Sequence, residues 1–231
     1  VLVRNSAEFF GTIGFVTALS LIPISTASVI LQASPLVVTI GAALFLAERV
    51  GWRRWTAILV GLAGVIVILR PGMAGFDANA LWAVLGVIGL SLRDLSTRRV
   101  PPEVTTLQLS AWAFAAVALA GLVLSLGPGA PKAMPSPQTL AELAFGLGFG
   151  LVGYALLTVA VRMGDLSVVA PFRYTRIIFA LALGLLLFGE RPDTPMLIGA
   201  ALIVGSGLYT LLREARLRRR RAPSPAAAAP L

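Results

Sequence analysis

The stretch Phe45-Leu46-Ala47-Glu48-Arg49 closes one apolar run of this chain, and Leu187-Phe188-Gly189-Glu190-Arg191 closes another. The two runs also open alike, with Ile-Ser-Thr-Ala at residues 24–27 and Leu-Ser-Val-Val at residues 166–169. Equivalent positions in the two runs are always 142 residues apart. A sequence that repeats itself within apolar segments is typical of a duplicated membrane bundle, and such bundles are commonly transporters.

The composition around this repeat indicates that the chain lies in lipid. Of its 231 residues, 58% are hydrophobic and 13% are charged, and the mean hydropathy is +0.90. A soluble domain carries about 25% charged residues, so too little polar surface is available here to face water on all sides. The apolar runs are continuous rather than alternating, which predicts an all-α, polytopic membrane helix bundle rather than a barrel.

The residue types that are missing restrict the chemistry. The chain has no cysteine and no histidine, which removes disulfides, thiolates and the commonest general base and metal ligand. We therefore expect no catalytic residue, no metal site and no cofactor. An integral-membrane enzyme would need a catalytic constellation at membrane depth, and no such motif is recognisable.

Eight membrane spans are predicted, separated by loops that contain proline, glycine and charged residues. They cover residues 5–22, 25–47, 55–70, 79–97, 105–126, 140–163, 166–188 and 194–212. Residues 213–231 are rich in arginine, then in alanine and proline, and we expect a disordered basic tail there.

The distribution of basic residues predicts the orientation of these spans, because cytoplasmic loops carry an excess of lysine and arginine. One side of the membrane would hold thirteen basic residues and the other side three. The first set is Arg4, Arg49, Arg53, Arg54, Arg98, Arg99, Arg162 and the six arginines of residues 213–221; the second is Arg70, Lys132 and Arg191. We therefore expect both ends of this chain in the cytoplasm and the spans in the inner (plasma) membrane.

This orientation makes the repeat an inverted one. Glu48 falls at the cytoplasmic end of the second span, whereas Glu190 falls at the outer end of the seventh. Inverted repeats allow a bundle to alternate between two mirror-related states around a central site, which is the basis of alternating access.

The same residues carry a family resemblance. The pattern Ala18-Leu19, Ile22-Pro23, Ala27, Ser34-Pro35, Glu48-Arg49, Gly61 and Gly64 has a counterpart at Ala160, Ser167, Pro171, Glu190-Arg191 and Gly199. In this combination the chain resembles the EamA-type transporters of the drug/metabolite transporter superfamily. The resemblance implies a ten-helix bundle that moves small metabolites, and it says almost nothing about which metabolite.

The resemblance also divides the chain into parts. Residues 1–72 resemble a partial first EamA repeat of three helices, residues 79–212 resemble a complete second repeat of five, and residues 213–231 form the tail. Two family helices would then precede residue 1; the alternative is an eight-helix variant.

The candidate substrate site is centred on Arg173 and Arg176. These residues are three apart within a predicted span, so they share one helical face, and an arginine in lipid is costly unless it reaches water or an acceptor. They could bind a carboxylate or phosphate, or instead pair with structural carboxylates such as Asp94 or Asp165. Pro171 lies before them and would loosen the helix, so it is a candidate for gating.

The second span supplies matching candidates. Gln32 and Ser34 lie at the depth of the arginines if the 142-residue offset is applied, and they are either substrate ligands or hydrogen-bonding residues between helices. Pro35 is a second candidate for gating. Arg93 and Asp94 are candidates for coupling, with an interfacial ion pair as the alternative.

Two aromatic residues complete the predicted site. Tyr174 and Trp112 lie inside spans and could stack on a planar substrate, although aromatic side chains inside bundles more often serve packing.

The sequence therefore predicts a secondary transporter for an anionic or zwitterionic, amino-acid-like metabolite, with export as the favoured direction. Uptake of a vitamin or a nucleotide-like cofactor is the alternative, and a non-transporting scaffold subunit is an alternative of another class. Expected partners are the small molecule, anionic lipids at the basic tail, and a second copy in a homodimer; no nucleic acid is expected.

Overall fold

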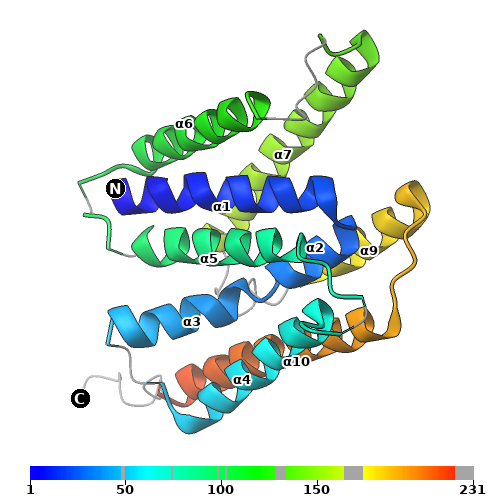
Figure 1. Ribbon diagram of the computed structural model, residues 1–231. Coiled ribbons are helices and arrows are strands. Elements are labelled where there is room, and N and C mark those ends of the chain that lie inside the picture. Colours follow the sequence, from blue (N-terminus) through cyan, green and yellow to red (C-terminus); the bar gives the residue numbers. More distant parts are fainter. Residues whose placement is uncertain are drawn as a thin grey trace.

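The computed structural model describes residues 1–47, 50–73, 75–97, 99–101, 103–127, 134–163 and 174–221. The regular secondary structure in these ranges is helical throughout (Figure 1). The helices are α1 (Leu2–Leu21), α2 (Ile24–Leu31), α3 (Ser34–Phe45), α4 (Trp52–Leu69), α5 (Ala80–Thr97), α6 (Thr106–Ser125), α7 (Pro137–Met163), α9 (Thr175–Phe188) and α10 (Thr194–Arg221).

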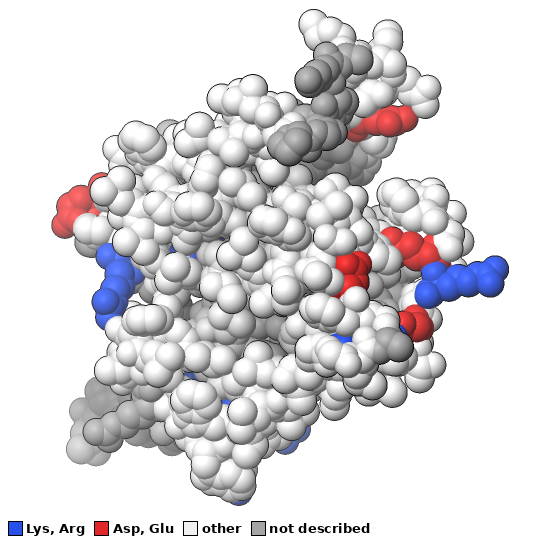
Figure 2. Space-filling view, in the orientation of Figure 1, with Lys and Arg blue, Asp and Glu red and all other residues white. Residues whose placement is uncertain are grey.

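The helices have the length and the surface of a membrane bundle. Within the described ranges five segments are long and apolar enough to cross a bilayer: Ile24–Phe45, Trp52–Leu69, Ala80–Thr97, Gln108–Ser125 and Thr194–Arg213. The predicted fold class, an all-helical polytopic membrane protein, is confirmed. Figure 2 shows the expected distribution of charge, with a broad uncharged surface across the middle and charged side chains toward the ends of the bundle.

The bundle has two ends, which we name after residues that lie there. The Arg4 end holds the start of α1, the end of α3, the start of α4 and the end of α5 (Figure 1, left). The Glu190 end holds the short connections from α1 to α2 and from α9 to α10 (Figure 1, right).

Two helix pairs approach closely because glycines face each other. In the first pair, a Cβ added to Gly14 of α1 would lie 2.7 Å from the backbone nitrogen of Gly86 on α5. In the second pair, a Cβ on Gly64 of α4 would lie 2.8 Å from the carbonyl oxygen of Gly199 on α10. Any side chain would push these helices apart, so small residues allow the packing that holds a membrane bundle together.

Helix α2 lies at the centre of the described helices. It contacts α1, α4, α5, α9 and α10. Its residues Ala27 and Val29 are fully buried, and Ile30 is 1% exposed. Buried residues in α2 or just after it are therefore surrounded by protein rather than lipid.

The structure differs from the sequence prediction in two elements. The predicted span 25–47 is divided into α2 and α3, which end and begin on either side of Gln32 and Ala33. The tail predicted to be disordered from residue 213 is helical as far as Arg221, because leucine, alanine, glutamate and arginine all favour a helix. Residues 166–173, the start of the predicted seventh span, lie outside the described residues; the other helices begin and end within a few residues of the predicted spans.

Candidate functional site

A break divides the span Ile24–Phe45 at Gln32 and Ala33. Gln32 and Ala33 donate to the carbonyls of Val29 and Ile30, in short turns with distances of 3.0 Å, instead of continuing the α-helical pattern. Pro35 has no N–H, so it cannot donate to the carbonyl of Leu31 four residues earlier. Discontinuous helices at mid-membrane depth expose backbone polar groups, and transporters use such breaks to bind substrates and ions.

Polar side chains from two other helices meet this break. Arg176 of α9 donates from Nη2 to Oε1 of Gln32 at 3.1 Å. The hydroxyl of Ser34 lies 3.0 Å from that of Ser91 on α5. The structure brings three of the predicted site residues, Gln32, Ser34 and Arg176, to the break. Gln32 and Ser91 are 6% and 2% exposed, Ser34 is half-buried and Arg176 is exposed.

Helices α2 and α9 run in opposite directions beside each other. Arg176 at the start of α9 contacts Gln32 at the end of α2, whereas Glu190, just after the end of α9, contacts the start of α2. These segments include the two sequence repeats. Their antiparallel contact is the arrangement that an inverted repeat requires.

Glu190 caps the first turn of α2 from a distance of more than 160 residues in the sequence. The backbone N–H groups of Ile24 and Ser25 donate to Oε1 and Oε2 of Glu190 at 2.6 and 3.1 Å. The residue at the N-cap position is Pro23, whose side chain has no oxygen to accept these bonds. A carboxylate at this place satisfies two amides and interacts favourably with the positive end of the helix dipole.

A cavity of about 270 Å³ lies at the Glu190 end. It is bounded by the start of α2, the end of α4, the start of α10 and the loop from α9 to α10, and its charged lining is Arg70, Asp77, Glu190, Arg191 and Asp193. Arg70 forms an ion pair with Asp193, and this hydrogen bond, supported by the amide of Met196, lowers the pKa of the Asp193 carboxyl below its ordinary value. The cavity is large enough for a small metabolite or for several water molecules.

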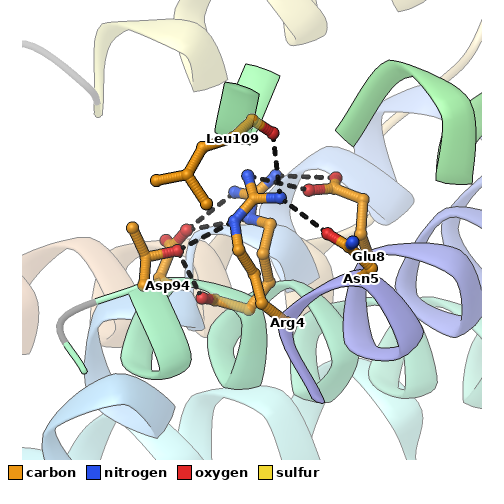
Figure 3. Close-up of polar contacts among 7 residues, drawn as sticks. Arg4, Asn5, Glu8, Asp94 and Leu109 are labelled. Atoms are coloured by element: carbon orange, nitrogen blue, oxygen red, sulfur yellow. Dashed lines mark hydrogen bonds and ion pairs between the residues drawn. The ribbon is translucent and has the colours of Figure 1, made fainter. Parts of the chain in front are cut away.

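The Arg4 end holds a different group of charges (Figure 3). Glu8 of α1 accepts from Nη1 of Arg93 at 2.9 Å and lies 3.8 Å from Nη2 of Arg4. Arg93 also donates to Oδ1 of Asp94 from Nε and Nη2, at 3.0 and 2.8 Å. Arg4 reaches Thr97 of α5 at 3.2 Å and the carbonyl of Leu109 of α6 at 3.3 Å.

This group of four, Arg4, Glu8, Arg93 and Asp94, is named the Arg4 cluster here. Two positive and two negative side chains balance each other within it, which makes their burial between α1, α5 and α6 tolerable. Arg93 pairs with Asp94, which is the ion pair that the sequence offered as the alternative to coupling. Arg93 also pairs with Glu8, and Glu8 is the more deeply buried of the two acids. Glu8 is 5% exposed, whereas the Asp94 side chain is 33% exposed.

The other predicted site residues lie in different places. Tyr174 is buried against α10, where a Cβ on Gly207 would collide with its ring. Trp112 is 57% exposed on α6, a helix that packs mainly on α1, so the structure does not bring it to the break. Arg173 and Pro171 lie outside the described residues.

Sequence reasoning passed over two contributors to these polar contacts. Ser91 has no sequence signal beyond its position in an apolar run. The pairing of Arg4 with Glu8 is indicated by their spacing of four residues, but the contact of Glu8 with Arg93 requires that α1 and α5 be placed side by side. Within the described ranges, no group of three or more acidic side chains could hold a metal ion.

The described helices form a bundle whose central span is broken. Its two repeat segments are in antiparallel contact, and its buried arginines are paired with acids. These features are typical of polytopic membrane proteins of the transporter class. The sequence model of the EamA-like transporter family matches residues 6–70 and 78–212, and the chain belongs to this family. It is therefore a transporter rather than an enzyme.

Relatives of known name support the same class. The chain is 29% identical over 216 residues to an S-adenosylmethionine uptake transporter of Rickettsia bellii, covering 92% of this chain and 72% of that protein. It is 30% identical over 223 residues to a riboflavin transporter of Rhizobium johnstonii, covering 96% and 72%. It is 29% identical over 215 residues to a pseudopaline exporter of Pseudomonas aeruginosa, covering 88% and 72%.

A comparison with solved structures agrees with the sequence comparisons. One crystal structure superposes with a TM-score of 0.56 at 25% sequence identity, covering 93% of this chain and 77% of the other.

Proposed function

We propose that this chain is a secondary transporter of a small organic metabolite that carries a carboxylate or a similar anionic group, working by alternating access in the inner membrane with its N-terminus in the cytoplasm. The observation that carries the proposal is the contact between Arg176 and Gln32 at the break between α2 and α3. It combines a positive side chain, a buried amide and a break in the helix at one level of the bundle.

The depth of this contact supports a binding role. Gln32 is the ninth residue of the 22-residue span Ile24–Phe45, about 12 Å from its start at 1.5 Å per residue. Arg176 is exposed at this level in the described structure. A guanidinium that faced lipid there would cost about 2.5–3.5 kcal/mol, so a position beside a water-filled path suits it better than a position in lipid.

The bound anion would exchange places with the amide oxygen of Gln32 on Arg176. A carboxylate accepts two parallel N–H bonds from a guanidinium, whereas the amide oxygen of Gln32 accepts one. Ser34 and Ser91 would then offer hydroxyl groups to the remaining polar atoms of the substrate.

The Glu190 end supplies a gate for this site. The cavity of about 270 Å³ reaches Ser25 and Thr26 in the first turn of α2, and Glu190 holds this turn against the end of α9. Opening on this side requires α2 and α9 to separate, which breaks the two hydrogen bonds to Glu190. Arg93, in contrast, is bonded to Asp94 and to Glu8 of α1, so this pair is proposed to fix α5 on α1 rather than to couple ions.

Export of an amino-acid-like compound is the direction we propose. Uptake of a vitamin or a nucleotide-like compound is the second candidate, favoured by the names of the uptake and riboflavin relatives. Both use the same site, so one experiment addresses them together.

The test is counterflow in proteoliposomes loaded with amino acids, organic acids, flavins and nucleotide-like metabolites, read by mass spectrometry. Arg176→Gln should reduce exchange of the transported compound by about tenfold or more, because a charge-assisted bond contributes about 1.5–3 kcal/mol. Arg176→Lys, which keeps the charge but not the bidentate geometry, should retain part of the activity.

Arg216→Gln is the matched control, because Arg216 is also exposed but lies beyond the apolar part of α10. It should exchange like the unmodified chain. Full exchange in both Arg176→Gln and Gln32→Leu would overturn the proposed site. If the unmodified chain, folded and monodisperse, exchanged none of the compounds, the transport proposal for this chain would be wrong.

A further inference from the structure

Helices α4 and α10 leave a groove between them at the Arg4 end. The two helices touch at Gly64 and Gly199, near the other end of α4. Toward the Arg4 end a groove of about 400 Å³ opens, lined by Trp52, Arg53, Thr56 and Val60 of α4 and by Gly205 and Tyr209 of α10. Neither Gln32 nor Arg176 lines this groove.

The mouth of this groove is basic and aromatic. The guanidinium carbon of Arg53 lies 5.3 Å from the centre of the Trp52 ring. Trp52 and Tyr209 are 71% and 48% exposed. Among the described residues, no carboxylate pairs with Arg53, so its charge is available to an outside partner.

The inner part of the groove is apolar and open. Val60 is 46% exposed, and a Cβ added to Gly205 would meet no atom within 4 Å. Val60 lies eight residues after Trp52, about 12 Å deeper along the helix axis. The groove therefore runs from the membrane interface, where tryptophan and tyrosine are enriched, well into the hydrocarbon region.

We propose that this groove binds an anionic glycerophospholipid, with the phosphate held at Arg53 and one acyl chain lying along Val60 and Gly205. Both parts of the groove fit this one ligand. A soluble phosphate would use only the mouth, and the apolar helix of another protein would leave Arg53 facing hydrocarbon at a cost.

The charge of the neighbouring chain is complementary to such a lipid. Helix α10 continues past Tyr209 to Arg221, and Arg213 follows Tyr209 by one helical turn on the same face. Each basic residue near the surface attracts an anionic headgroup by about fivefold in affinity. Arg53 and Arg213 together therefore favour a negatively charged headgroup over a zwitterionic one.

The experiment measures lipid binding to the purified full chain in detergent by native mass spectrometry. The probes are phosphatidylglycerol and phosphatidylcholine with identical acyl chains, and soluble glycerol phosphate. The unmodified chain should retain phosphatidylglycerol at least fivefold more tightly than phosphatidylcholine, and glycerol phosphate at a hundredfold excess should not displace it.

Two variants separate the parts of the site. Arg53→Gln should lower the preference for phosphatidylglycerol over phosphatidylcholine by about fivefold and leave the part that is due to Arg213. Gly205→Leu fills the inner groove and should weaken both lipids by about tenfold. Gly121→Leu is the matched control, because Gly121 of α6 is equally free of neighbours within 4 Å.

The outcomes decide the proposal. An unchanged preference in Arg53→Gln, or unchanged lipid retention in Gly205→Leu, would overturn it. Displacement by glycerol phosphate would show a site for free phosphate esters instead. Loss of a dimer in Gly205→Leu, with lipid binding intact, would assign the groove to a second copy of the chain. Because Arg53 is exposed, Arg53→Gln tests the proposal even if Gly205→Leu does not fold.

Discussion

The two ends of this bundle are held by charged side chains with different kinds of partner. At the Arg4 end, two arginines and two acids are bonded to each other between α1, α5 and α6. At the Glu190 end, one carboxylate is bonded to the backbone of a helix more than 160 residues away. The first group joins α1 to α5 through side chains and reaches α6 at the carbonyl of Leu109, whereas the second holds one helix end against another.

The difference matters for the proposed alternating access, in which helices of the bundle have to separate. Separating the helices of the Arg4 cluster would leave several buried charges without partners, which is very costly in lipid. Separating α2 from Glu190 exposes two amides and a carboxylate beside a cavity of about 270 Å³, where water replaces the lost bonds. We therefore expect the Arg4 end of α1 and α5 to stay together while the contact of α2 with α9 opens and closes.

The largest effect is expected from Glu8→Gln. This change removes the negative charge that lies between Arg4 and Arg93, and breaking a buried ion pair costs about 3–5 kcal/mol. The free energy of unfolding in mixed detergent, followed by circular dichroism, should fall by that amount.

The control for this variant is Glu142→Gln. Glu142 is an exposed acid on α7 whose described partner is the amide of Gln138, and its replacement should change the free energy of unfolding by less than about 0.5 kcal/mol. If the two variants were equally stable, the Arg4 cluster would not hold the helices as argued.

A smaller effect on stability, with a larger one on movement, is expected from Glu190→Gln. Glutamine keeps an acceptor but loses the charge, so the cap on α2 should weaken by about 1–2 kcal/mol. A change of about 1.4 kcal/mol alters an equilibrium constant tenfold. The ratio of open to closed states at this end should therefore rise by about five- to thirtyfold.

The natural absence of cysteine makes this measurable. Thr26 lines the cavity beside Glu190, and Thr26→Cys introduces a single thiol whose labelling by a water-soluble maleimide reports access to α2. Glu190→Gln should accelerate this labelling, whereas Arg191→Gln, which leaves the carboxylate in place, should not. Equal rates in both would refute the gate.

Features that depend on neighbouring residues could be predicted from the sequence. Span positions follow from the length of apolar runs, and the repeat follows from the recurrence of Phe45–Arg49 in Leu187–Arg191, so both are local information. The division of the second span at Gln32 could have been read from Pro35, because the loss of one N–H at a fixed position is also local. The basic composition from residue 213 onward predicted disorder, but residues 213–221 are helical because leucine, alanine, glutamate and arginine favour a helix.

The contacts that make the site are not local. Glu190 reaches α2 only because α9 lies antiparallel to it, and Glu8 reaches Arg93 only because glycines let α1 approach α5. The residues next to Glu190 and Glu8 in the sequence do not indicate which helix each acid contacts. The roles of Gln32, Ser34 and Arg176 remain predictions, now with a shared position in the bundle.

The smallest effect is expected at the ion pair between Arg70 and Asp193, which joins the end of α4 to the start of α10 at the cavity. The pKa of Asp193 is lowered in the folded chain, first by the hydrogen bond from Arg70. Its contribution to stability is therefore present above the ordinary pKa of about 3.9 and is lost as the pH falls through the lower, folded value. The Asp193 side chain is 51% exposed, so solvent screening limits the contribution to less than about 1 kcal/mol.

Asp193→Asn isolates this charge, because asparagine can still accept from the amide of Met196 and cap α10. The thermal midpoint of the variant should lie slightly below that of the unmodified chain at pH 6, and the gap should close as the pH is lowered toward 3. High salt should narrow the gap at pH 6, since an exposed pair is screened. A gap that stayed constant with pH would mean that Asp193 acts at this end through its shape and its cap alone, leaving Glu190 as the charge that holds the Glu190 end closed.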